Sequence, residues 1–253
     1  MRLFDAHFHL IDPRFPLVAN DGYLPPPFTA ADYRARMAGV ELAGGAVVSG
    51  SFQAFDQTWL RAALAELGPG FVGVTQLPDA ATDDEILALD QAGVRAVRFN
   101  VRRCGSESLA ELESFAKRVH GLALWHVEIY IDSRALPELE ATLLRLPAVS
   151  VDHLGLSRDG FPALLRLAER GVRVKATGFS RGDLDVPRAL RDLAAANPDA
   201  LMFGTDLPST RAPRPYGDED LRIVLDALEP ALAAKALLTN ALAFYRAGGT
   251  LSA

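Results

Sequence analysis

Two histidines lie one residue apart near the start of the chain, in the segment "FDAHFHL". In a β-strand, successive side chains point to opposite faces, so His7 and His9 share one face and Phe8 takes the other. Two imidazoles on one face can polarise a carbonyl group or bind a metal ion. The pair therefore predicts a chemical site at the end of the first strand.

Two further residues carry suitable chemistry inside apolar surroundings: His153 in "VDHLG" and Asp206 in "FGTDLP". A carboxylate in such a position can act as a general base toward water. The alternative is that Asp206 caps a turn before Pro208 and that His153 packs in the core. Three other candidates are expected to be structural or inert: His120, His126 and Cys104.

The elements that must position these groups form a regular alternation. Between the strand-like apolar runs lie helical patterns, and two more helices are predicted after the last run, over residues 218–228 and 230–245. Thr82 with Glu85 and Ser108 with Glu111 have the spacing of a capping box. The strand-like runs cover residues 2–10, 44–50, 71–77, 94–100, 124–132, 148–155, 172–178 and 201–208.

Strands that alternate with helices pair in parallel, and eight such units in 253 residues match one (β/α)8 barrel. The sequence therefore predicts an α/β fold, a single TIM barrel domain over residues 1–253 with one or two extra C-terminal helices. A doubly wound open sheet is the alternative, but no glycine-rich dinucleotide fingerprint follows the first strand.

Polar residues gather at the ends of the predicted strands, where the active sites of such barrels lie. Polar groups inside apolar strands cost free energy unless they have partners, so their common position favours a site over chance. Besides the histidines and Asp206, these strand-end residues are Ser49, Ser51, Gln76, Arg98, Asn100, Glu128, Tyr130, Lys175 and Thr177. The proline-rich segment 12–27 is the one long loop, and a loop of this length is expected to be either functional or disordered.

The composition and charge of the chain exclude some classes of binding partner. Charged residues make up 23% of the chain, the net charge is -6, and the lysines and arginines are scattered, so no nucleic-acid footprint is present. No apolar run approaches the roughly 18 residues of a membrane span, and no secretory leader pattern opens the sequence. A single cysteine forms no internal disulfide. We expect a cytoplasmic protein without membrane partners, and association into a homo-oligomer stays open.

Taken in order, "FDAHFHL", "VDHLG" and "FGTDLP" on a (β/α)8 pattern resemble the amidohydrolase superfamily. More narrowly, "GYLPPPFT", "GVRAVRFNVRR", "WHVEIYID" and "VRVKATGFSR" resemble its 2-pyrone-4,6-dicarboxylate lactonase group. The resemblance covers essentially the whole chain. It implies a hydrolase that opens the lactone ring of a small carboxylated compound from aromatic or sugar-acid catabolism.

The resemblance also implies roles for individual residues. Asp206 would be the general base for the attacking water, and His7, His9 and His153 would polarise the lactone carbonyl. Tyr130 would hold the carbonyl or a carboxylate. The substrate carboxylates would be bound by Arg98, Arg102 or Arg103, and Arg181, with Tyr23 and Ser51 as further hydrogen-bonding groups.

Many members of the superfamily bind one or two divalent ions through such residues. A binuclear site usually needs a bridging lysine or glutamate from the middle strands, and a mononuclear one a histidine on the fifth. Here the fifth strand ends in Glu128 and Tyr130, and Lys175 lies on the seventh. This departure argues against a binuclear site, and the resemblance to the pyrone lactonases implies catalysis without a cofactor as the first expectation. One zinc ion remains the alternative, held by His7, His9, His153 and Asp206.

Three other activities stay open at this stage. Relatives with the same set of residues decarboxylate or hydrate unsaturated dicarboxylates, and a zinc-dependent sugar lactonase would use the same scaffold. A barrel that only binds its ligand is the non-enzymatic alternative.

Overall fold

The computed structural model describes residues 2–103 and 107–247, so Cys104 lies outside the described residues. Eight parallel strands form one sheet in chain order, β1 to β8. They are β1 (Arg2–Phe8), β2 (Glu41–Val48), β3 (Phe71–Thr75), β4 (Val94–Asn100), β5 (His126–Tyr130), β6 (Val149–Val151), β7 (Arg173–Ala176) and β8 (Leu201–Phe203).

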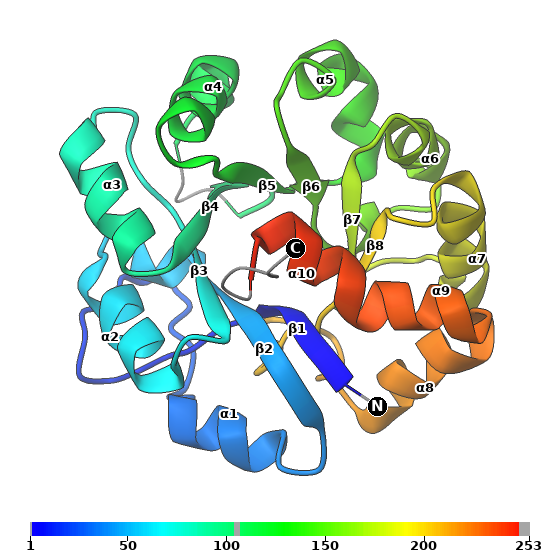
Figure 1. Cartoon of the computed structure of the whole chain (residues 1–253), viewed down its shortest axis with the longest axis horizontal. Coiled ribbons are helices and arrows are strands. Elements are labelled where there is room, and N and C mark those ends of the chain that lie inside the picture. Colours follow the sequence, from blue (N-terminus) through cyan, green and yellow to red (C-terminus); the bar gives the residue numbers. More distant parts are fainter. Residues whose placement is uncertain (1, 104–106, 248–253) are drawn as a thin grey trace, which may run out of the picture.

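The sheet curves until β8 meets β1, as Figure 1 shows. Two backbone hydrogen bonds join the strand-end segments at this seam: Asp206 N donates to His7 O over 2.7 Å, and His9 N donates to Leu207 O over 2.7 Å. The predicted (β/α)8 barrel is confirmed. Through these main-chain contacts, the seam also brings His7 and His9 close to Asp206.

Helices surround the barrel (Figure 1). Thr82 and Glu85 form the predicted capping box at the start of one of them. The α-helices are α1 (Ala30–Arg36), α2 (Thr58–Leu67), α3 (Asp83–Gln91), α4 (Leu112–Ala123), α5 (Leu136–Leu143), α6 (Phe161–Glu169), α7 (Val186–Ala196), α8 (Asp218–Ala227), α9 (Pro230–Ala234) and α10 (Asn240–Tyr245). Short 3₁₀ turns follow several strands: η1 (Ser51–Gln53), η2 (Leu109–Glu111), η3 (Ser133–Ala135) and η4 (His153–Gly155).

The predicted C-terminal helix over residues 230–245 is present as three consecutive pieces: α9, one π-helical turn (η5, Lys235–Thr239) and α10. In Figure 1 these red and orange segments cross one end of the barrel. They pack against β1 and β8. This end is therefore closed, and the opposite end, where the strands finish, is left for a site.

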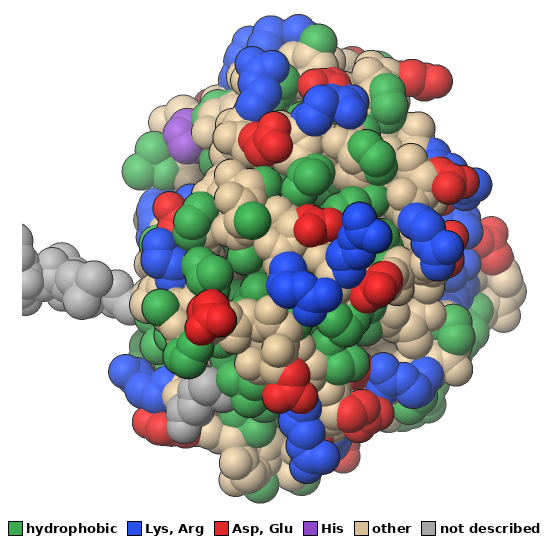
Figure 2. Space-filling view, turned by 90° about the vertical axis from the view of Figure 1, so that its right-hand side faces the viewer, with side chains coloured by type: hydrophobic (Ala, Val, Ile, Leu, Met, Phe, Trp, Pro, Cys, Tyr) green, Lys and Arg blue, Asp and Glu red, His purple; other side chains and the backbone are tan. Residues whose placement is uncertain are grey.

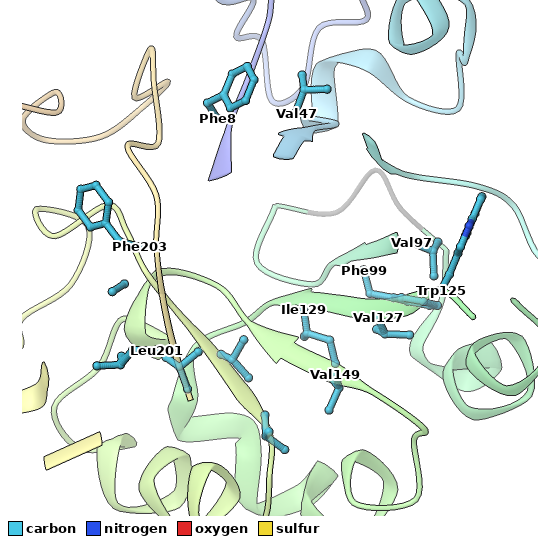
Figure 3. Close-up of a cluster of buried hydrophobic side chains, with 14 of the residues drawn as sticks. Phe8, Val47, Val97, Phe99, Trp125, Val127, Ile129, Val149, Leu201 and Phe203 are labelled. Carbon is cyan, nitrogen blue, oxygen red and sulfur yellow. The ribbon is translucent and has the colours of Figure 1, made fainter. Parts of the chain in front are cut away.

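Alternate strand residues build the main core, which lies between the sheet and the helices (Figure 3). On β4 and β5 the outward side chains Val97, Phe99, Val127 and Ile129 join this layer. The residues between them point into the barrel, because strand side chains alternate in direction. Each inner position is thus free to carry polar chemistry without disturbing the outer core.

The barrel interior is apolar toward the closed end. Phe4 and Met202 pack there with Tyr245 of α10. Burial of such side chains contributes roughly 1.5–3 kcal/mol each. The charged residues inside the barrel therefore lie above an apolar floor.

Six of the predicted strands are shorter than expected, and the difference matters most for two of them. The run 148–155 leaves strand conformation after Val151, and the run 201–208 leaves it after Phe203. His153 has φ +52° and Asp206 has φ +61°, and strand residues do not adopt this left-handed backbone. The two functional candidates therefore have strained backbone directly after their strands, His153 at the start of η4 and Asp206 in a loop.

The second predicted capping box was wrong. The Ser108 hydroxyl accepts from Ala110 N, so it caps the 3₁₀ turn η2, and α4 begins later, at Leu112.

Figure 2 shows one face of the molecule, on which acidic and basic side chains are interspersed. This mixture agrees with the scattered charges of the sequence. Among the described residues, no helix combines the length and apolar character needed to cross a bilayer.

Candidate active site

A cavity opens at the carboxyl ends of the strands. Its walls include eight residues predicted from the sequence: His9, Tyr23, Ser51, Arg98, Arg103, Tyr130, His153 and Arg181. Asn100, Thr210 and Arg211 also line it. The other two predicted residues, His7 and Asp206, are buried next to residues of this wall.

Three histidine rings meet beside the cavity. The His7 ring centroid lies 5.0 Å from that of His9 and 4.9 Å from that of His153. Burial lowers the pKa of all three imidazoles, and for His9 the value falls to about 3. Nearby cations act in the same direction, among them Lys175 on His7. All three rings are therefore neutral at pH 7, and each carries one N–H.

The backbone fixes which nitrogen of His9 carries the proton. His9 Nδ1 lies 2.7 Å from Val48 O, and a carbonyl oxygen only accepts hydrogen bonds, so Nδ1 is the donor. The lone pair then remains on Nε2. This nitrogen lies 3.9 Å from Asp206 Oδ1, so both acceptors are within reach of one water molecule.

Only one of the two carboxylate oxygens of Asp206 accepts a hydrogen bond from the described residues. Arg181 Nε donates to Oδ2 over 2.6 Å, and Oδ1 has no hydrogen-bond partner among the described residues. Burial raises the pKa of Asp206, and the Arg181 charge opposes this rise. A carboxylate with an unused oxygen and a raised pKa is suited to accept a proton.

Two glycines allow this close arrangement. A Cβ on Gly204 would lie 2.6 Å from His7 N, and a Cβ on Gly178 would lie 2.7 Å from His153 Nδ1. Gly178 also has φ +59°. Both positions therefore favour glycine, which lets the loops after β7 and β8 contact the histidines.

A charged cluster lies under the histidines, inside the barrel. The Lys175 ammonium group donates to Glu128 Oε2 and lies 3.7 Å from Asp152 Oδ1. Arg98 donates to Asp152 Oδ2 from both Nε and Nη2, over 3.0 and 2.9 Å. All four side chains are buried, and two cations balance two carboxylates.

Glu128 has two more donors, which fix it in the ionised form. Tyr245 Oη donates to Oε1 over 2.5 Å, and His126 Nε2 lies 3.3 Å from the same oxygen. Burial raises the pKa of Glu128, but Lys175 and His126 outweigh burial, so the pKa is lowered. His126 therefore has a structural role, as expected from the sequence.

Two arginines of the cavity wall are not neutralised by a carboxylate. Among the described residues, neither Arg103 nor Arg211 has an acidic group within ion-pair distance, whereas Arg98 and Arg181 each have one. Arg211 Nη1 donates to Asn20 Oδ1 over 3.0 Å, which ties the long loop after β1 to the loop after β8. The cavity therefore carries excess positive charge.

Two groups of three side chains are close enough to share a metal ion, with candidate ligand atoms within 4.8 Å of one another: His7, His9 and Asp206, and His7, Asp152 and His153. His9 Nε2 and Asp206 Oδ1 offer free lone pairs. His7 is a poor ligand, because its Nδ1 lies 3.2 Å from Lys175 Nζ, a donor. Its proton must then be on Nε2, which leaves no lone pair for an ion. With His7 in this tautomer, neither group offers three free ligand atoms to a divalent ion.

Sequence reasoning missed three residues of this site. Asp152 precedes His153 in "VDHLG" and pairs with Arg98. No sequence pattern distinguished this carboxylate from its neighbour His153. Arg211 and Asn20 lie in loops without a periodic pattern. Only the proline-rich character of segment 12–27 pointed to Asn20.

Other predicted strand-end residues lie away from the cavity. Gln76 donates to Ala54 O over 3.2 Å, and Thr177 lines a smaller neighbouring hollow. Arg102 faces an outer hollow, and Arg103 faces both this hollow and the cavity.

The fold and the cluster define a class: a parallel (β/α)8 barrel in which histidines of the first and sixth strand ends meet an aspartate of the eighth. The family model for amidohydrolases matches residues 4–247. The chain therefore belongs to the amidohydrolase family, and it is a hydrolytic enzyme.

Individual relatives agree with this assignment. A 2-pyrone-4,6-dicarboxylate hydrolase of Comamonas testosteroni is 29% identical over 232 residues, covering 81% of this chain and 76% of the relative. An Agrobacterium tumefaciens protein solved in its apo form is 23% identical, with a TM-score of 0.85 and coverage of 98% and 97%. A probable 2-pyrone-4,6-dicarboxylic acid hydrolase of Acinetobacter baumannii, solved with citric acid bound, is 19% identical, with a TM-score of 0.86 and coverage of 97% and 100%. The two structures support the fold.

Proposed function

We propose that this enzyme hydrolyses the ester bond of a small lactone that carries two carboxylates, of the 2-pyrone-4,6-dicarboxylate kind. The observation that carries the proposal is the pair of arginines without acidic partners, Arg103 and Arg211, in the same cavity as His9 and His153. The activity named for the Comamonas relative supports the same substrate class.

The charge of the cavity selects a dianion. Four guanidinium groups and no carboxylate are among the described residues that line it. Asp152 and Asp206 neutralise two of these groups, which leaves two for the substrate. Guanidinium groups match carboxylates in a bidentate geometry, so one substrate carboxylate is assigned to Arg103 and one to Arg211. Tyr23, Ser51 and Tyr130 line the same cavity and would add hydrogen bonds to the substrate.

Asp206 activates the water. Its free Oδ1 and the lone pair on His9 Nε2 lie 3.9 Å apart, so one water can donate a proton to each. Asp206 takes the proton as the water oxygen bonds to the lactone carbonyl carbon. His9 orients the water in this account, which refines the role that the resemblance implied for it.

The remaining histidines stabilise the oxyanion. The proton of His7 is on Nε2, which is buried and has no acceptor among the described residues. A developing alkoxide on the carbonyl oxygen would supply that acceptor, with His153 as a second donor. Donors aimed at a forming charge in a buried site act mainly on the transition state.

Collapse of the tetrahedral intermediate breaks the ring C–O bond, and protonated Asp206 returns its proton to the leaving oxygen. The new carboxylic acid then ionises, so each turnover releases one proton at pH 7. No cofactor takes part in these steps, in line with the poor fit of His7 to a metal ion.

A panel of pyrone, muconate and sugar lactones, offered to chelator-treated enzyme, tests the proposal. We expect proton release with 2-pyrone-4,6-dicarboxylate and at least about tenfold lower kcat/KM with lactones that lack one carboxylate. Carbon dioxide release would indicate a decarboxylase instead. Preference for uncharged sugar lactones, or activity only with added zinc, would also contradict the proposal.

A further inference from the structure

We propose that the ammonium group of Lys175 takes the place of a divalent cation in this barrel, and that it excludes such an ion from the histidine cluster. Removal of this one side chain should turn the chain into a metal-binding protein. This exclusion concerns metal binding by the protein and does not depend on which ester the enzyme cleaves.

The position of the ammonium group is the first argument. Lys175 Nζ lies 3.2 Å from His7 Nδ1 and 3.7 Å from Asp152 Oδ1. These residues belong to one of the two groups that are close enough to share an ion. The Lys175 ammonium group is therefore a cation that already lies beside two of the three residues that would bind a metal ion.

The hydrogen bond to His7 is the second argument. An ammonium group donates only, so His7 Nδ1 must accept and Nε2 must keep the proton. In this tautomer His7 also has no Nε2 lone pair to offer the other candidate group, with His9 and Asp206. Lys175 thus acts as a positioning residue that sets the tautomer of His7. Because His7 belongs to both candidate groups, this tautomer excludes an ion from each of them.

Charge balance is the third argument. Lys175 and Arg98 neutralise Glu128 and Asp152, and Arg181 neutralises Asp206. All of these groups are buried, so a divalent ion would add two uncompensated charges. Without Lys175, the same cluster carries excess negative charge and a free His7 Nδ1, which favours a cation.

The test compares zinc and cobalt binding to chelator-treated wild-type protein, Lys175→Met and the matched control Lys117→Met. Lys117 is a surface lysine that pairs with Glu113 over 2.6 Å. We expect Lys175→Met to bind one zinc ion per chain at least about 100-fold more tightly than the wild type. Its cobalt form should show the absorption bands of low-coordinate nitrogen and oxygen ligation. The control should match the wild type, and adding His7→Gln to Lys175→Met should abolish the gain.

Equal zinc affinity of the wild type and Lys175→Met would overturn the proposal. Since a buried methionine could prevent folding, the wild type provides a second test through ¹⁵N NMR of its histidines. The proposal requires His7 to be protonated on Nε2 and unprotonated on Nδ1, and its resonances to stay unchanged when zinc is added. A proton on His7 Nδ1, or a zinc-dependent shift, would overturn it whether or not any lactone is hydrolysed.

Discussion

Arg181 Nε lies 2.6 Å from Asp206 Oδ2, and this contact joins the loop after β7 to the loop after β8. Burial works against the positive charge of Arg181, but Asp206 outweighs burial, so the pKa of Arg181 is raised. The same pair leaves Asp206 Oδ1 free. One side chain therefore restrains the proposed base without using the oxygen that reacts.

Replacement of Arg181 by methionine should move the acid limb of the pH–rate profile to higher pH. Without the guanidinium group, the largest influence that lowers the pKa of Asp206 is lost, so burial raises this pKa further. The profile of kcat/KM between pH 4 and pH 9 is the measurement. Arg145→Met, which breaks a surface pair with Glu113, is the control and should leave the profile unchanged. An unshifted acid limb in Arg181→Met would contradict this assignment.

The wild-type enzyme should lose activity only on the acid side of neutral pH. The pKa of Asp206 is raised above 3.8, so protonation removes the base as the pH falls through the raised value. The pKa values of His7, His9 and His153 are lowered, so these rings stay neutral as the pH rises from 6 to 8. A decline of kcat/KM between pH 6 and pH 8 would be the opposite result.

Arg103→Gln should raise KM for a dicarboxylate lactone about 10- to 100-fold, because a hydrogen bond to a charged group contributes about 1.5–3 kcal/mol. The effect on kcat should be smaller. Arg102→Gln is the matched control, since Arg102 faces only the outer hollow. Steady-state kinetics with mono- and dicarboxylate lactones measure kcat and KM for both variants. If the control weakened binding more than Arg103→Gln, the carboxylate assignment would be wrong.

Tyr245→Phe should destabilise the fold by about 1–3 kcal/mol, because Glu128 loses the buried hydroxyl donor that lies 2.5 Å from its Oε1. Urea unfolding measures this change. The ring would still fill the apolar floor beside Phe4. Activity of the folded variant should stay within a few-fold of the wild type. An unchanged free energy of unfolding would show that the closed end does not depend on this hydroxyl group.

The fold was predictable because the apolar pattern is local. Alternation along β4 and β5 separates outer residues such as Phe99 and Ile129 from inner ones such as Arg98 and Glu128, and this period is visible in the sequence. The order of strands then follows from parallel pairing through helical crossovers.

Much of the candidate site was also predictable, since its residues follow strands. The partnerships within it were not. Lys175 and Glu128 meet from strands that are separated in the chain, and Tyr245 reaches them from the last helix. No local pattern encodes such contacts. The left-handed backbone at His153 and Asp206 likewise depends on the seam between β8 and β1, which forms only when the barrel closes.

The central claim is that Asp206 activates water against a dicarboxylate lactone. The most direct measurement is the rate of 2-pyrone-4,6-dicarboxylate ring opening by chelator-treated wild type, Asp206→Asn and the surface control Asp199→Asn. We predict turnover by the wild type and the control, and a kcat lower by about 10²- to 10⁴-fold in Asp206→Asn, which should still fold. Equal rates for Asp206→Asn and the wild type, or no ring opening by the wild type, would contradict the account.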